Sequence, residues 1–138
     1  MNNMDDNERQ RFAEIVCIHA NRRFGELLKE LCKKANIKQD KLEEESEIYR
    51  TYLIERYPIQ SGLTGGFKQS AISRVFKGQQ IPTYSQVFIW TTILQRHLSE
   101  EDFPKDLRDD LYYLSGHVPP ETIVDAYERR TKKSEESP

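Results

Sequence analysis

Residues 65–83, GGFKQSAISRVFKGQQIPT, carry the pattern of a short helix between two turns. Ile72 and Val75 are three positions apart, which predicts one buried stripe on a helix whose other side is polar. Glycine on each side of the apolar pair permits a turn with positive φ before the helix and ends the helix after it. These turns are expected at Gly66 and Gly78.

The predicted helix lies in a long window without carboxylates. Residues 57–99 contain no Asp or Glu, although an even spread of the chain's 23 acidic residues over 138 positions would put about seven in this window. Between its cations stand Gln and Ser side chains, which donate hydrogen bonds without adding negative charge, as suits a surface that faces a polyanion. The cations in this window are Lys68, Arg74, Lys77 and Arg96.

These residues resemble the Xre/Cro-type helix-turn-helix family of phage and bacterial repressors. Residues 66–67 are similar to the turn before the family's recognition helix, and residues 70–75, SAISRV, are similar to that helix. Residues 24–31 and 36–42 resemble the first helix and the start of the second, and residues 111–119 resemble a fifth helix with the segment that leaves it. The resemblance implies an all-α, five-helix bundle and a sequence-specific DNA-binding transcriptional regulator, expected to be a dimeric repressor that reads the major groove.

The resemblance also implies which side chains meet the partner, double-stranded DNA. A short helix enters the major groove by its N-terminal half, so outward side chains on its first two turns reach base edges. Side chains that flank this face, and those at the start of helix two, are better placed for phosphates. For the bases we expect Gln69, Ser70, Ser73 and Arg74, and for the DNA backbone Gln39, Lys68, Lys77, Gln79 and Gln80.

One departure from the family pattern enlarges helix two and the loop after it. The run from Gln39 to Ile72 is longer than the family's usual spacing, so residues of about 46–64 form an insertion. Apolar and aromatic residues at 3/4 spacing predict that helix two continues to Arg56 and stops before Pro58. A loop over residues 58–65 would then lead into the recognition helix.

An acidic run in helix two supports an alternative function. Its carboxylates are expected to form a solvated face and, in a DNA-binding protein, to point away from the duplex or contact a partner. The alternative is a protein-interaction module, antitoxin-like or an adaptor, that grips a basic partner with helix two and the insertion. The acids are Glu43, Glu44, Glu45 and Glu47, and the inserted Tyr49, Tyr52 and Tyr57 fit a packing wedge, a dimer contact or a partner surface.

Composition and hydropathy argue against a membrane protein or a secreted protein. With 36% hydrophobic and 32% charged residues in 138 positions, the chain fits one soluble domain with terminal extensions. It has neither a run of 18 apolar residues nor a secretory leader, which predicts no membrane contact and a cytoplasmic location. The net charge of −2 is segregated, so the local sign of the recognition helix counts more than the total.

No constellation of residues points to catalysis, a cofactor or a metal. Cys17 and Cys32 lack CxxC spacing and are expected to be reduced core residues. His19, His97 and His117 stand on three separate segments without a second ligand at metal-binding spacing. No phosphate loop or nucleophile motif is present. We therefore expect a protein that is not an enzyme and needs no cofactor.

The domain organisation follows from caps and breaks along the chain. We expect an N-terminal helical extension over residues 1–21, a short C-terminal helix over residues 120–130 and a disordered tail over residues 131–138, and the resemblance implies that residues 22–119 form the DNA-binding domain. Asp5 or Asp6 would cap a helix over residues 7–20, which is either separate from a helix over 24–35 or one bent rod with it. Before Pro104, Asp102 is expected to cap the helix that Gly116 ends. The expected core includes Ile72, Val75, Phe88 and Trp90.

Two apolar stripes outside the helix-turn-helix predict homodimerisation. One short recognition helix reads few base pairs, and a two-fold pair bound to related half-sites removes that limit. The stripes consist of Phe12, Ile15 and Val16 near the N-terminus and of Ile123, Val124 and Tyr127 near the C-terminus. The alternative is that both stripes pack on their own domain.

Overall fold

The structure is a computed structural model that describes residues 5–57 and 65–136. The described residues form helices and no strands, which confirms the all-α class. The helices are α1 (Asp6–Lys34), α2 (Gln39–Arg56), α3 (Gln69–Phe76), α4 (Tyr84–His97), α5 (Lys105–Leu114) and α6 (Pro120–Glu136). The expected loop over residues 58–65 lies mostly outside the described residues.

The first helix is one continuous helix of 29 residues, which resolves the choice between two helices and one rod. Asp5 caps it, since its side chain accepts a hydrogen bond from the Glu8 backbone N–H. The helix ends at Lys34. After the C-cap residue Ala35, Asn36 has a φ of 57°, and the Ile37 N–H closes the last turn by bonding to the Cys32 carbonyl.

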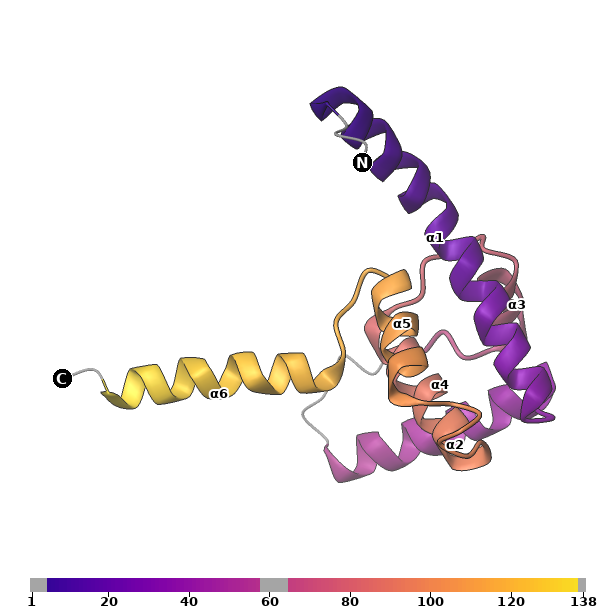
Figure 1. The fold of residues 1–138 in the computed structure, drawn as a ribbon. Coiled ribbons are helices and arrows are strands. Elements are labelled where there is room, and N and C mark those ends of the chain that lie inside the picture. Colours follow the sequence, from indigo (N-terminus) through magenta and orange to yellow (C-terminus); the bar gives the residue numbers. More distant parts are fainter. Residues whose placement is uncertain (1–4, 58–64, 137–138) are drawn as a thin grey trace.

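The core lies where α1, α2, α3, α4 and α5 meet (Figure 1). Ile72, Val75 and Trp90 are fully buried, as predicted, whereas Phe88 is only partly buried and packs against the outside of the core. Phe67, from the turn before α3, meets the Trp90 ring edge to face with 6.0 Å between centroids. This contact ties the turn that precedes α3 to the centre of the bundle.

Close backbone contact between α1 and α3 depends on glycine. A Cβ on Gly25 would lie 2.2 Å from the Val75 carbonyl oxygen, and a Cβ on Gly78 would lie 2.7 Å from the Arg22 Cα. Gly78 also has a φ of 74°, as its predicted role at the end of α3 requires. Both ends of this contact therefore exclude any larger residue.

Three expectations about side chains and ends are wrong. Asp102 does not cap α5, because the Pro104 backbone stands at the cap position and the Asp102 carboxylate instead pairs with Lys34 Nζ at 3.2 Å. Cys17 is exposed rather than buried, because the first half of α1 extends beyond the core (Figure 1). The C-terminal helix does not stop at Arg130 but continues to Glu136, since no glycine or proline interrupts it.

Burial raises the pKa of the Cys32 thiol to about 12. This thiol therefore stays protonated at neutral pH, as expected of a core residue.

Candidate nucleic-acid interface

The exposed face of α3 brings together most of the predicted site residues. On a helix, positions 69, 70, 73, 74 and 77 share the side opposite the buried Ile72 and Val75. Of these, Ser73 is half-buried and the others are exposed. Lys68 stands at the N-cap, Lys77 at the C-cap, and Gln79 follows the closing glycine. The residues on or beside this face are Lys68, Gln69, Ser70, Ser73, Arg74, Lys77 and Gln79.

The turn before α3 is held by one buried side chain that is not among the predicted site residues. Gln86, which is 1% exposed, donates from Nε2 to the Gly66 carbonyl at 2.7 Å. Its Oε1 accepts from the Thr83 N–H at 2.8 Å, and its own N–H donates to Thr83 Oγ1, which completes a capping box at the start of α4. Gly66 has the predicted positive φ, at 102°. Gln86 thereby ties the turn at Gly66 to the start of α4, which fixes the entry to α3. The pattern T-x-x-Q over residues 83–86 was the available signal.

Arg74 does not stand alone on this face. Its Nε–H donates to Gln80 Oε1 at 3.0 Å, so the guanidinium leans toward the segment after α3. The contact is exposed, and a guanidinium keeps further N–H donors for a ligand. Arg74 and Gln80 thus form one polar unit at the C-terminal end of the face.

A carboxylate borders the other end of the face. The Gln69 backbone N–H donates to Glu43 Oε2 at 2.6 Å, so a side chain from α2 occupies the N-terminus of α3. Helix α3 has no acidic residue in its own first turn, and Glu43 supplies the negative charge that a helix N-terminus favours. The expectation of a solvated face is therefore wrong for Glu43, which is partly buried against the start of α3. The pairing is 26 residues apart in sequence, across the insertion, which is why local pattern could not reveal it.

The other acidic side chains of α2 differ in their contacts and exposure. Glu45 Oε1 lies 2.8 Å from His97 Nε2, and Glu47 Oε2 lies 3.5 Å from Arg50. Glu44 is exposed. Arg96 lies over the Tyr49 ring, with 4.7 Å from its Cζ to the ring centroid, so both residues join α2 to α4. This contact favours a packing role for Tyr49.

Gln39 lies apart from the α3 face, in a hollow of about 360 Å³ between the end of α1, the start of α2 and the end of α3. Its apolar floor is formed by Cys32, Ile37 and Phe76, and Lys29, Lys33 and Lys38 stand around it. The helical spacing of Lys29 and Lys33 was the missed signal, because residues four apart share one helix face. Since Phe76 belongs to α3, this hollow connects Gln39 and three lysines to the C-terminal end of α3.

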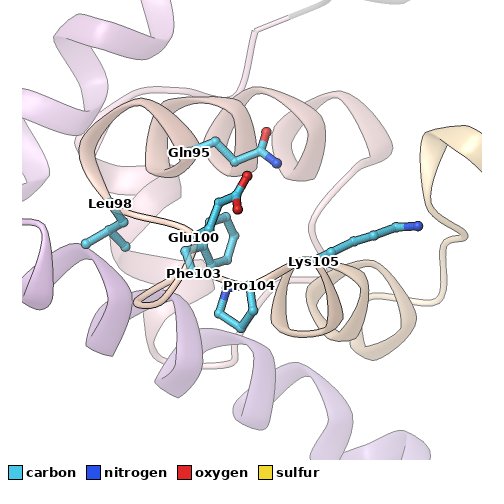
Figure 2. Close-up of a pocket in the computed structure, with 6 residues that line it drawn as sticks. All are labelled: Gln95, Leu98, Glu100, Phe103, Pro104 and Lys105. Atoms are coloured by element: carbon cyan, nitrogen blue, oxygen red, sulfur yellow. The ribbon is translucent and has the colours of Figure 1, made fainter.

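A second pocket, of about 440 Å³, lies at the connection between α4 and α5 (Figure 2). In Figure 2 the Glu100 carboxylate points toward Gln95, and Lys105 extends away from both. None of its lining residues belongs to α3 or to the predicted site, so it lies outside the candidate interface.

Within the described part of the chain, no three His, Cys, Asp or Glu side chains gather in a way that could hold a metal ion. Among residues 5–57 and 65–136, no helix has both the length and the apolar character needed to cross a membrane.

Comparison of the chain with protein families, with curated proteins and with solved structures found no match.

Replacing Glu43 by Gln should strengthen binding of a polyanion at low salt by roughly threefold, since it removes one like charge beside the α3 face. The amide oxygen can still accept from the Gln69 N–H, so the free energy of unfolding should fall by less than about 1 kcal/mol. Anisotropy titration with a short duplex measures the first effect. The matched control is Glu44→Gln, one residue away and exposed, and an equal gain for both variants would contradict a local effect of Glu43.

Proposed function

We propose that the protein is a sequence-specific DNA-binding regulator that acts as a dimer and reads the major groove with α3. The observation that carries the proposal is the exposed face of α3, which presents cations and hydrogen-bond donors with no carboxylate of its own. Rigid attachment supports it, because α3 is fixed by the Gln86 contacts at its entry and by Gly25 and Gly78 against α1. A reading helix must be held in one orientation to select bases.

In this proposal, the side chains on the exposed face of α3 have distinct roles. Arg74 carries the fork of donors that pairs with guanine, and Gln69 the amide that pairs with adenine. Lys68 and Lys77 at the two ends of α3 would contact phosphates on either side. The lysines around the Gln39 hollow extend the cationic surface beyond α3. Because the Glu43 carboxylate lies at the N-terminus of α3, the Lys68 end of the face should attract phosphate less strongly than the Lys77 end.

The resemblance to Xre/Cro-type proteins belongs to the same proposal. It is supported by the order of a first helix that includes residues 24–31, a second helix starting at Gln39 and a short third helix between positive-φ glycines. The lengthened α2 remains the main departure from that pattern.

One observation favours the alternative of a protein-interaction module. Ile48 and Tyr52 on α2 and Tyr57 at its C-cap are 62%, 48% and 49% exposed. Arg56 stacks near both tyrosine rings, at 5.9 Å from each centroid. Such an aromatic surface with a central Arg is typical of protein interfaces. Binding to a protein partner without any affinity for a duplex would favour this alternative.

The test of the DNA proposal is a titration at several salt concentrations. Affinity for a duplex should fall steeply with salt, because each phosphate contact releases condensed counterions. Lys77→Ala should weaken all sequences alike and lower the salt slope by about one unit. Lys105→Ala is the matched control, since it removes the same charge on α5, which lies away from α3. An unchanged slope for Lys77→Ala would remove this phosphate contact from the proposal.

A further inference from the structure

Beyond its first turn, the last helix does not pack against the other helices of the described residues. Every described side chain from residue 121 to residue 132 is exposed, and Figure 1 shows α6 extending away from the bundle. Its apolar stripe, Ile123, Val124 and Tyr127, is 46%, 52% and 71% exposed. A helix of 17 residues is marginal in water without tertiary packing. The stripe therefore needs a surface to cover it.

A groove of matching character lies between α1 and α5. It has a volume of about 520 Å³ and apolar walls formed by Val16, Ala20, Leu27, Leu107, Tyr113 and Leu114. Phe12, one turn before Val16 and 57% exposed, extends the apolar line on α1 toward the N-terminus. The groove and Phe12 together form a mainly apolar surface of the kind that receives one face of an amphipathic helix.

The groove is not placed to receive α6 of its own chain. His117 Nε2 lies 3.0 Å from the Pro82 carbonyl oxygen, which fixes the segment between α5 and α6. Arg108 donates to both Glu121 carboxylate oxygens, at 2.9 and 2.6 Å, which fixes the first turn of α6. These bonds lower the pKa of the Glu121 carboxyl, so the pair stays ionised at neutral pH. So held, α6 points away from α1 (Figure 1).

The charges of the two surfaces are complementary. Among the residues that line the groove, Arg23 stands on α1 and Asp110 on α5. At 100° per residue, Glu128 and Arg130 border opposite edges of the α6 stripe. In one direction of docking, an incoming α6 places Glu128 beside Arg23 and Arg130 beside Asp110. In the reverse direction, Glu128 would lie beside Asp110 and Arg130 beside Arg23, so that like charges meet. The charges therefore select a single direction of docking.

We propose that the groove between α1 and α5 binds α6 of a second copy of this chain, and that the exchange is reciprocal. A two-fold pair satisfies both grooves and both helices with the same contacts, which closes the assembly at two copies. The proposal rests on the dimeric regulator proposed above, for which it supplies the interface. Its test uses no DNA, so failure of the interface and failure of DNA binding are observed separately.

The first arm of the test is sedimentation equilibrium of the full chain and of Tyr127→Asp. The intact protein should be a dimer at micromolar concentration, and the substitution should weaken the dimer at least roughly 100-fold, because it places a charge in two apolar grooves at once. Tyr127 is exposed, so the circular dichroism of the variant should be unchanged. The control Thr122→Asp adds the same charge outside the stripe and should leave the dimer intact.

The second arm exchanges one pair of charges. Arg23→Glu and Glu128→Arg should each weaken the dimer by roughly tenfold, and the double variant should regain most of the loss, since the pair occurs twice in a two-fold dimer. Asp125→Arg, a charge reversal on the opposite face of α6, should have no such effect.

A monomer for the intact chain at concentrations on the order of 100 µM would overturn the proposal, whether the groove takes another protein or none. A dimer that tolerates Tyr127→Asp would overturn it as well, because the interface would then lie elsewhere. Loss of DNA binding with an unchanged dimer would leave this interface standing and remove the DNA-binding function.

Discussion

Gly25→Ala should lower the free energy of unfolding by about 3 kcal/mol or more. A new Cβ would lie 2.2 Å from the Val75 carbonyl oxygen and 2.6 Å from that of Phe76, and both are backbone atoms that cannot rotate away. The two helices would have to separate, which would also displace the α3 face. In an ordinary helix interior the same change would stabilise by up to about 1 kcal/mol. The sign of the effect is therefore diagnostic.

Urea denaturation measures this change in the free energy of unfolding. Gly65→Ala is the control, because a Cβ there meets no atom within 4 Å. A neutral or stabilising result for Gly25→Ala would show that α1 and α3 do not pack as closely as described. The position assigned to the α3 face would then be wrong.

Arg74→Ala should cost about 1–3 kcal/mol of binding free energy on a preferred duplex and should relax selectivity at one base pair. On random-sequence DNA the loss should be smaller, since only one charge is removed from the backbone contacts. Arg74→Lys separates the two effects, because it keeps the charge and removes the planar fork of donors. Competition titrations with the two kinds of duplex measure the difference, and equal losses on both would end the base-reading role of Arg74.

Local sequence pattern correctly predicted the helices whose ends are marked by distinctive residues. The stripe of Ile72 and Val75 between two glycines predicted α3, and the structure gives both glycines positive φ. The 3/4 spacing up to Arg56 predicted the lengthened α2, which ends at that residue. These predictions held because the determining interactions lie within a few residues of one another.

Contacts between residues far apart in sequence could not be predicted from local pattern. Nothing near Glu43 in sequence shows that its carboxylate meets the Gln69 N–H. Likewise, the position of Asp102 before Pro104 favoured a helix cap, whereas its carboxylate pairs with Lys34, which is distant in sequence. The exposure of Cys17 depends on where the bundle stops covering α1, which is a property of the whole fold rather than of the helix.

The last helix illustrates a third limit. Low hydrophobicity beyond Arg130 indicated disorder, because such a segment buries too little apolar surface to order itself. The structure nonetheless continues α6 to Glu136. Helix propensity without a breaker extends the element past Arg130.

Selection of bound duplexes from a random-sequence pool by the whole chain is a direct test of base recognition by α3. We predict enrichment of a palindromic sequence whose half-site centres lie about 34 Å apart, one helical turn of DNA. Arg74→Ala should lose the enriched base pair at one position of each half-site, while the rest of the sequence is retained. A pool that remains unenriched after repeated selection, at salt concentrations low enough to retain DNA on the protein, would contradict sequence-specific recognition by α3.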